Sequence, residues 1–326
     1  MPRTRKPRSG TMQFWPRKRA RRQYPRVRAW VYRKEPVLLG FAGYKVGMAH
    51  VIYTDNRKTS KTKGQDIACP VTIVECPPIK IMSVRFYKKD AYGMKAAKEI
   101  TVAAEKDLER KICIPKKTDA KELDKIRPEE FNDLTVVVYT QPKLTGIGKK
   151  RPEIFEIALG GSIKDKFEYA KQNIGKEIKI TDIFKEGELV DIHGVSKGKG
   201  TQGPVKRFGI SIRSHKAEKT KRGPGSLGGW RGQGHMMYRV AHAGQMGYHT
   251  RTEYNKWLMK IGHDQKDIEG INPKSGFRRY GVVKNPFLMI KGSVVGPTKR
   301  MIRINAAYRG DYKVPKEAPS IQKIIM

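Results

Sequence analysis

The distribution of positive charge constrains this chain more than any other feature of its sequence. Residues 1–34 hold 13 lysines and arginines and no acidic residue. Residues 193–326 hold 27 lysines and arginines and 7 acidic residues. Residues 35–192 hold 29 basic and 24 acidic side chains, an ordinary balance. A net charge of +38 repels itself in a compact state, so a dense polyanion is the expected environment. Two basic blocks around a near-neutral middle predict a folded body with arms that lie on nucleic acid.

Length, cysteine content and hydrophobic runs further limit the class of protein and its cellular compartment. A chain of 326 residues with 38% hydrophobic content is long enough to bury a real core. Cys69, Cys76 and Cys113 form no CxxC pair and have no histidine at zinc spacing, which favours a reducing compartment and no metal site. No run approaches the roughly 18 apolar residues of a membrane helix, and the N-terminus lacks the apolar segment of a signal peptide. We therefore expect a soluble, intracellular protein.

The first basic block predicts an extension rather than part of the core. Residues 1–34 contain four prolines, no helical period, and aromatic side chains spaced among arginines. Phe14, Trp15, Tyr24 and Trp30 are suited to stacking on bases or packing on a partner. A solvated tail or a localisation signal is the alternative. The number of aromatics favours an arm that becomes ordered on RNA.

The middle of the chain predicts a mainly β fold with a helical insertion. Residues 91–112 change to Ala, Lys and Glu at helical spacing, and Thr118 is placed to cap a second helix that stops before Pro128. The insertion therefore covers about 90–130. Runs of β-branched and aromatic residues between Gly, Pro and polar turns predict strands on both sides of it. The predicted strands lie within 37–54, 67–76, 81–87, 134–140, 154–160, 177–184, 189–195, 282–295 and 300–308.

The segment after residue 195 predicts a long loop. Thirteen glycines lie between His193 and Gly247, too many for a helix or a well-packed pair of strands, and Glu218 is the only acidic residue in that span. Gly198, Gly200 and Gly203 match GxGxxG, but a dinucleotide site needs a helix that opens there. Pro204 and two basic residues follow without an apolar 3.6-residue period. The glycines and lysines instead suit close approach of the backbone to RNA phosphates.

Five histidines lie in or beside this loop, at positions 193, 215, 235, 242 and 249. No cysteine is near them and no HExxH spacing occurs, so a metal site is not indicated. Catalysis by histidine needs an orienting carboxylate, and only Glu218 and Glu253 are close in sequence. Imidazoles that stack on bases or donate to phosphate are the simpler interpretation. We predict no enzyme activity, no cofactor and no small-molecule substrate.

Several motifs in order resemble a known family. VDIHGVSKGKGTQGPVKRFG (190–209) resembles the signature of the universal large-subunit ribosomal protein 3 family. GYKVGMAHVI (43–52), GPGSLGGW (223–230), AHAGQMGYHTRTEYN (241–255) and GSVVGPTKRMIRI (292–304) follow in the family's order. SGTMQFWPRKRARR (9–22) is similar to the extension of archaeal and eukaryotic members, and its length suits the archaeal type.

The resemblance implies a β-barrel body of the translation-factor type with two projections. The expected organisation is a basic rRNA-binding extension over 1–35, a body over 36–195 and 256–326, and an rRNA-penetrating loop over 196–255. The loop would reach toward the peptidyl transferase centre with Trp230 near its tip. Some family members are methylated here, and His215 and Gln233 are the candidates in this chain.

The implied function is that of a structural, cytoplasmic component of the large ribosomal subunit. Its partners would be large-subunit rRNA and neighbouring ribosomal proteins, with no membrane. A free-standing translation factor or nucleotide-binding enzyme on a similar barrel is the alternative, and it needs a phosphate loop that the chain lacks. The predicted RNA contacts are Trp15, Arg17, Lys18, Arg19, Arg21, Arg22, Lys197, Lys199, Lys206, Arg207, His215, Lys221, Arg222, Trp230, Arg231, His235, His249, Arg251, Lys299 and Arg300.

Overall fold

The computed structural model divides the chain into two compact units, which are described separately. The body comprises Tyr24–Gly194 and Thr252–Met326, and the basic unit comprises Met1–Gln23 and Val195–Arg251. The structure describes residues 10, 12–102, 105–114, 121–217, 219–229, 236–310 and 317–325.

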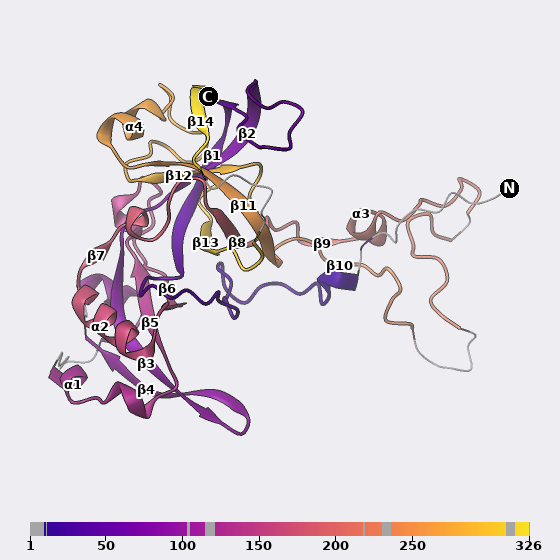
Figure 1. Ribbon diagram of the computed structural model, residues 1–326. Coiled ribbons are helices and arrows are strands. Elements are labelled where there is room, and N and C mark those ends of the chain that lie inside the picture. Colours follow the sequence, from indigo (N-terminus) through magenta and orange to yellow (C-terminus); the bar gives the residue numbers. More distant parts are fainter. Residues whose placement is uncertain are drawn as a thin grey trace. The chain divides into compact units, whose positions relative to one another are not determined.

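The larger sheet of the body contains a ring of six strands (Figure 1). Its strand order is β13-β8-β11-β12-β2-β1-β14, and a further pairing of β1 with β13 completes the ring. β14 lies outside the ring, on β1. The strands are β1 (Gly40–Thr54), β2 (Asp66–Glu75), β8 (Leu189–Val195), β11 (Thr250–Gly262), β12 (Phe287–Lys291), β13 (Met301–Ala306) and β14 (Ser320–Ile325).

β1 is long enough to pair with three strands. Along one edge it pairs antiparallel with β2 from Tyr44 to Thr54, with a register shift between Lys45 and Gly47. On the other edge, its first five residues pair with β13 and its last five with β14. Its buried residues alternate with more exposed ones in the second half, as expected for a strand with one face on a core.

A second sheet has the order β4-β3-β5-β6, with β7 paired to β3. Its strands are β3 (Ile79–Asp90), β4 (Gly93–Thr101), β5 (Asp133–Thr140), β6 (Ile154–Ala158) and β7 (Glu177–Ile178). The body's α-helices are α1 (Lys121–Asp124), α2 (Ile163–Asn173) and α4 (Gln265–Gly270). Its short 3-10 turns are η2 (Lys106–Arg110), η3 (Pro128–Glu130), η4 (Pro142–Leu144) and η5 (Ile180–Asp182).

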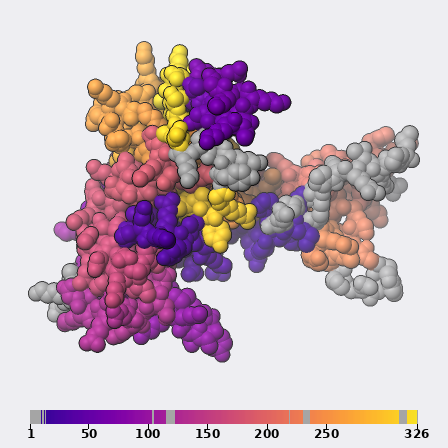
Figure 2. All heavy atoms as spheres, viewed as in Figure 1, coloured from indigo at the N-terminus to yellow at the C-terminus, as the bar shows by residue number. Residues whose placement is uncertain are grey.

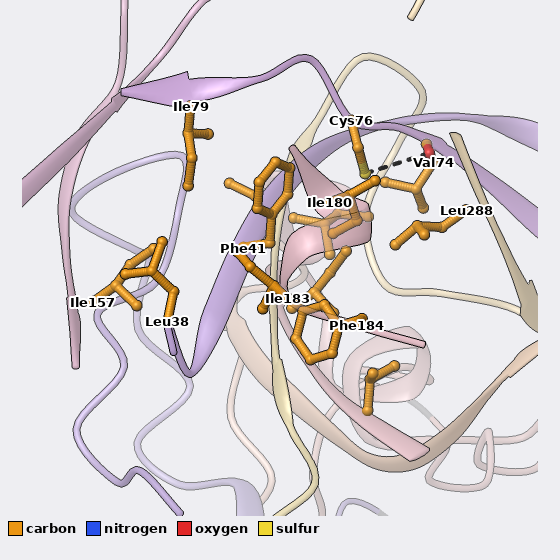
Figure 3. Close-up of a cluster of buried hydrophobic side chains, with 14 of the residues drawn as sticks. Leu38, Phe41, Val74, Cys76, Ile79, Ile157, Ile180, Ile183, Phe184 and Leu288 are labelled. Carbon is orange, nitrogen blue, oxygen red and sulfur yellow. Dashed lines mark hydrogen bonds between the residues drawn. The ribbon is translucent and has the colours of Figure 1, made fainter. Parts of the chain in front are cut away.

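One main hydrophobic cluster joins both sheets of the body. Phe41 of β1, Ile157 of β6 and Leu288 of β12 belong to it, together with Phe184 from the segment after β7 (Figure 3). Cys76 is also part of this cluster, and burial raises the pKa of its thiol well above the ordinary value. All three cysteines are free; Cys69 is buried like Cys76, and Cys113 is exposed. The mainly β prediction is confirmed.

The predicted helix over 91–112 is wrong. Residues 93–101 form β4, which pairs antiparallel with β3 along its whole length, and a 3-10 turn follows at Lys106–Arg110. Alanine, lysine and glutamate favour a helix locally, but pairing with the edge of β3 overrides that weak preference. The hairpin projects at the lower edge of the body (Figure 2). Tyr92, in the turn between β3 and β4, is 93% exposed. The second predicted helix is reduced to α1, and Thr118 lies outside the described residues.

Candidate nucleic-acid interface

The two limbs of the Gly-rich loop run antiparallel in the basic unit. The short strands β9 (Thr201–Gln202) and β10 (Gly244–Gln245) pair with each other. Nearer the start of the loop, Ser196 N donates to the carbonyl oxygen of His249 at 2.9 Å, and Lys199 N donates to that of Met246 at 3.0 Å. The loop therefore leaves and returns as a two-limbed ribbon with its own backbone hydrogen bonds.

A short helix follows the glycine motif. α3 (Pro204–Phe208) begins after Gly203, with proline in its first turn, and ends at Gly209 in a left-handed conformation. We expected no helix at this point, so that expectation is wrong. The helix nevertheless spans only five residues and follows a two-residue strand, so the βαβ unit of a dinucleotide site is absent here.

Arg207 joins the two limbs. Its Nε donates to the carbonyl oxygen of Gln245 at 3.0 Å, and its Nη1 donates to those of His242 at 2.9 Å and Ala243 at 3.4 Å. Burial lowers the pKa of its guanidinium. The sequence predicted Arg207 as an RNA contact, and the structure adds a structural role that its sequence position does not reveal.

The N-terminal extension packs on the loop within the same unit. The Nδ1 atom of the buried His249 donates to the carbonyl oxygen of Lys18 at 3.0 Å, and Ala20 N donates to that of Tyr248 at 2.9 Å. Burial is the main cause that lowers the pKa of His249. This histidine therefore has a structural role in joining extension and loop.

Arginine–aromatic contacts complete this packing. The guanidinium of Arg17 lies 4.5 Å from the ring centre of Phe208, that of Arg19 lies 5.7 Å from Tyr248, and that of Arg251 lies 5.0 Å from Phe14. Phe14 belongs to η1 (Met12–Phe14). Phe208 and Tyr248 were not singled out from the sequence, although aromatic residues interleaved with arginines were the available signal.

The basic unit is almost free of negative charge. Its two segments contain 21 lysines and arginines and one acidic residue, Glu218. Ten of the predicted contacts are exposed side chains of this unit: Lys18, Arg19, Arg21, Arg22, Lys197, Lys199, Lys206, His215, Lys221 and Arg222. The predicted contacts Trp15, Arg17, Arg207 and Arg251 are half-buried. Since few acids compete for these cations, a polyanion is the natural counter-charge.

The remaining predicted contacts lie elsewhere. Lys299 and Arg300 belong to the body, in the turn before β13, where Lys299 is exposed and Arg300 half-buried. Trp230, Arg231 and His235 lie outside the described residues, as does Gln233. The site assignment as a whole stays a prediction.

The described residues contain no group of three or more histidine, cysteine or acidic side chains arranged to hold a metal ion. Within the same ranges, no helix is long and apolar enough to cross a membrane.

His193 lies in the body, outside the basic unit. Its Nδ1 is 2.9 Å from Thr252 Oγ1, and its pKa is lowered to about 4, first by burial and then by the charge of Arg303.

A mainly β body and a unit with 21 basic residues against one acid are typical of a nucleic-acid-binding protein. The family model of ribosomal protein L3 matches residues 1–325. Large ribosomal subunit protein uL3 of Methanothermobacter thermautotrophicus is 47% identical, over 99% of this chain and 98% of its own. The proteins of that name from Archaeoglobus fulgidus and Methanocaldococcus jannaschii are 44% and 43% identical, each over 93% of this chain and 92% of its own.

The chain therefore belongs to the ribosomal protein L3 family, whose members are structural constituents of the ribosome and not enzymes. This confirms the resemblance found in the sequence motifs, and the archaeal relatives confirm its archaeal type.

Proposed function

We propose that this chain is a structural protein of the large ribosomal subunit that binds ribosomal RNA through its basic unit. Family membership over nearly the whole chain is the observation that carries this assignment. The surplus of cations in the basic unit supports RNA as the partner, because phosphates replace the missing acidic side chains. The chain acts in the cytoplasm, within the subunit, and its further partners are neighbouring ribosomal proteins.

The proposal includes a role for each part of the chain. Residues 36–195 and 256–326 form a body that contains a barrel of the translation-factor type. The ring of six strands supports the barrel, and the second sheet of the body lies outside it. Residues 1–35 are the rRNA-binding extension, of which residues 1–23 lie in the basic unit. Residues 196–255 penetrate the rRNA toward the peptidyl transferase centre, with Trp230 near the tip. The paired limbs of the loop support this role because they give it the form of one continuous ribbon.

Crosslinking of the native protein in purified large subunits tests the proposal. Ultraviolet light joins side chains to the nucleotides that they touch, and sequencing of both products identifies the contacts. We expect crosslinks from exposed residues of the basic unit, such as Arg21, Lys199 and Arg222, to large-subunit rRNA. Absence of the protein from large subunits, or crosslinks confined to the body, would contradict the proposal.

The alternative is a free-standing translation factor or nucleotide-binding enzyme. A nucleotide-binding measurement distinguishes it from a structural ribosomal protein. Such a protein binds a nucleoside triphosphate through a phosphate loop that opens a full helix. Here the helix after Gly203 ends at Phe208. Titration of the purified protein with ATP and GTP should therefore give no saturable binding that depends on magnesium, as binding by a phosphate loop would.

A further inference from the structure

The basic unit contains a hollow of about 310 Å³ whose walls come from both the extension and the loop. A cavity of this size reaches the lower end of the range for small-ligand pockets, roughly 300–1,000 Å³. Its lining includes Trp15, Arg17, Arg207, Phe208, Tyr238 and His242. Three aromatic rings, one imidazole and two guanidiniums therefore meet around one space.

The aromatic side chains of this hollow differ in exposure. Phe208 is 5% exposed and belongs to the packed part of the unit, whereas Tyr238 is 72% exposed. Trp15 meets Tyr238 edge to face, with ring centres 6.4 Å apart and an angle of 87° between the planes. A turn closed by Val240 N donating to the carbonyl oxygen of Met237 at 3.1 Å carries Tyr238. Among the described residues, Tyr238 has one ring contact, that with Trp15, and most of its surface is exposed to another planar group.

The cations of the hollow favour an anionic ligand. The guanidiniums of Arg17 and Arg207 lie 4.5 and 5.0 Å from the ring centre of the same phenylalanine, Phe208. Two like charges on one ring repel each other. A phosphate beside Arg17 would offset this repulsion.

We propose that this hollow binds one unstacked nucleotide of ribosomal RNA, with its base against Tyr238 and Trp15 and its phosphate beside Arg17. RNA-binding proteins hold splayed-out bases by stacking them on aromatic rings or guanidinium planes, and this hollow offers both. The inference rests on the proposed function, because it takes the polyanion of the basic unit to be rRNA. It adds a defined base-binding site, which the contacts between the extension and the loop assemble.

The first test uses the native particle and needs no variant. Large subunits are irradiated with ultraviolet light, and the peptides that contain Trp15 and Tyr238 are analysed for attached nucleotides. We expect both peptides to be crosslinked to the same nucleotide. Crosslinks from these peptides only to protein, or no crosslink at all while other basic-unit peptides are joined to rRNA, would overturn the inference and leave the proposed function intact.

The second test measures the chemical reactivity of that base in subunits that contain Tyr238→Ala. Loss of one stacking ring should raise the reactivity about fivefold or more. Tyr238→Phe keeps the ring and should leave the base protected. Tyr92→Ala, which removes a similarly exposed tyrosine from the body, should also have no effect. Equal reactivity in all three variants and the wild type would overturn the inference, whereas absence of the wild-type protein from large subunits would instead contradict the proposed function.

Discussion

Arg303 is the most deeply buried arginine of the body, with 2% of its surface exposed. Its Nη2 donates to the carbonyl oxygen of Glu156 at 2.6 Å, and its guanidinium lies 4.6 Å from the ring centre of Phe155 and 5.6 Å from that of Trp30. Burial lowers the pKa of its guanidinium. Carbonyl dipoles and aromatic faces replace water around this cation. Part of the chain's positive charge therefore has a structural use inside the body.

Arg207 and Arg303 mark a limit of sequence interpretation at the level of single residues. The surplus of basic residues predicts a polyanionic partner, but it does not reveal which arginines face that partner. Both side chains donate to carbonyl oxygens of residues more than 30 positions away in the chain. Such partners are defined only once the chain has folded, and no local pattern encodes them.

His193 should make the stability of the body depend on pH. Its pKa of about 4 in the folded state lies below the value of about 6.5 expected in the unfolded chain. The unfolded state therefore binds more protons between these values, so stability is full above pH 6.5 and is lost as pH falls toward 4. We expect His193 to account for a loss of about 2 kcal/mol, after allowance for partial solvent screening.

Thermal unfolding at pH 7 and pH 4 tests this prediction, with His193→Gln as the matched variant. Carboxylates titrate in the same window, so the relevant quantity is the difference between the two proteins. The variant should lose less stability on acidification than the wild type. Equal losses would show that His193 is readily protonated in the folded protein, contrary to its burial beside Arg303.

At the scale of elements, α2 was missed although its start has a local signal. Ser162 Oγ accepts a hydrogen bond from Asp165 N at 3.4 Å, and the Asp165 carboxylate accepts one from Ser162 N at 3.0 Å. This reciprocal capping box appears in the sequence as serine followed three residues later by an acid. The helix buries Phe167, whose ring centre lies 6.1 Å from that of Phe86 in β3.

Removal of this cap should weaken the body measurably. Ser162→Ala leaves backbone N–H groups at the start of α2 without their acceptor, and we expect a loss of about 1 kcal/mol in the free energy of unfolding. Ser162→Asn keeps a capping acceptor and should lose much less. Denaturant unfolding of both variants measures the difference; equal stability of Ser162→Ala and wild type would show that the cap contributes nothing.

The extension divides between the two units near Gln23. Tyr24 and Val27 are 8% and 7% exposed within the body, and the Tyr24 hydroxyl donates to the carbonyl oxygen of Ile154 at 2.8 Å. Deletion of residues 1–23 should therefore leave cooperative unfolding of the body intact and weaken incorporation into large subunits.

Deletion of residues 1–34 is the matched comparison. It also removes the buried Tyr24 and Val27 and the half-buried Trp30, and loss of a buried apolar side chain costs about 2–5 kcal/mol. Its melting temperature should fall well below that of the shorter deletion. Identical melting of the two truncated proteins would show that residues 24–34 do not stabilise the body.

Strand prediction succeeded where the residues themselves favour strands. β1, β2, β5 and β8 coincide with runs of β-branched and aromatic residues. β4 was predicted as a helix because its alanine, lysine and glutamate favour one locally. Seven of its nine residues are exposed, so only its pairing with β3 defines it as a strand. β11 and β14 were missed for a related reason. Both mix charged and apolar residues without strict alternation, so the neighbouring strands, rather than their own pattern, define them.

At the scale of the whole molecule, affinity for rRNA should depend strongly on salt. Each phosphate neutralised contributes about −0.7 to −0.9 to the slope of log affinity against log salt concentration. Engagement of six or more of the exposed cations of the basic unit therefore predicts a slope of about −5 or steeper. Filter binding of the full chain to a large-subunit rRNA fragment between 50 and 200 mM KCl measures it, roughly the range over which such slopes are resolved.

Deletion of residues 1–23 provides the internal control for this measurement, because it removes 9 of the 21 basic residues of the basic unit. The slope should become shallower if these cations contact phosphate. A slope near zero in the full chain would mean that contacts other than phosphate neutralisation dominate binding.

The count of basic residues predicts the salt dependence from the sequence alone. The packing of the extension against the loop could not be predicted, because it depends on contacts such as that of Arg17 with Phe208, more than 190 residues apart.

The pairing of β1 with β13 also bears on the synthesis of the chain. The ring joins a strand that begins at Gly40 to one that ends at Ala306, so it closes only after more than nine-tenths of the chain has been made. Until then, one edge of β1 and one edge of β8 lack their partner, and open strand edges invite pairing with other chains. A nascent chain stalled before Met301 would therefore be prone to aggregation. A partner that covers those edges during synthesis would lower this risk.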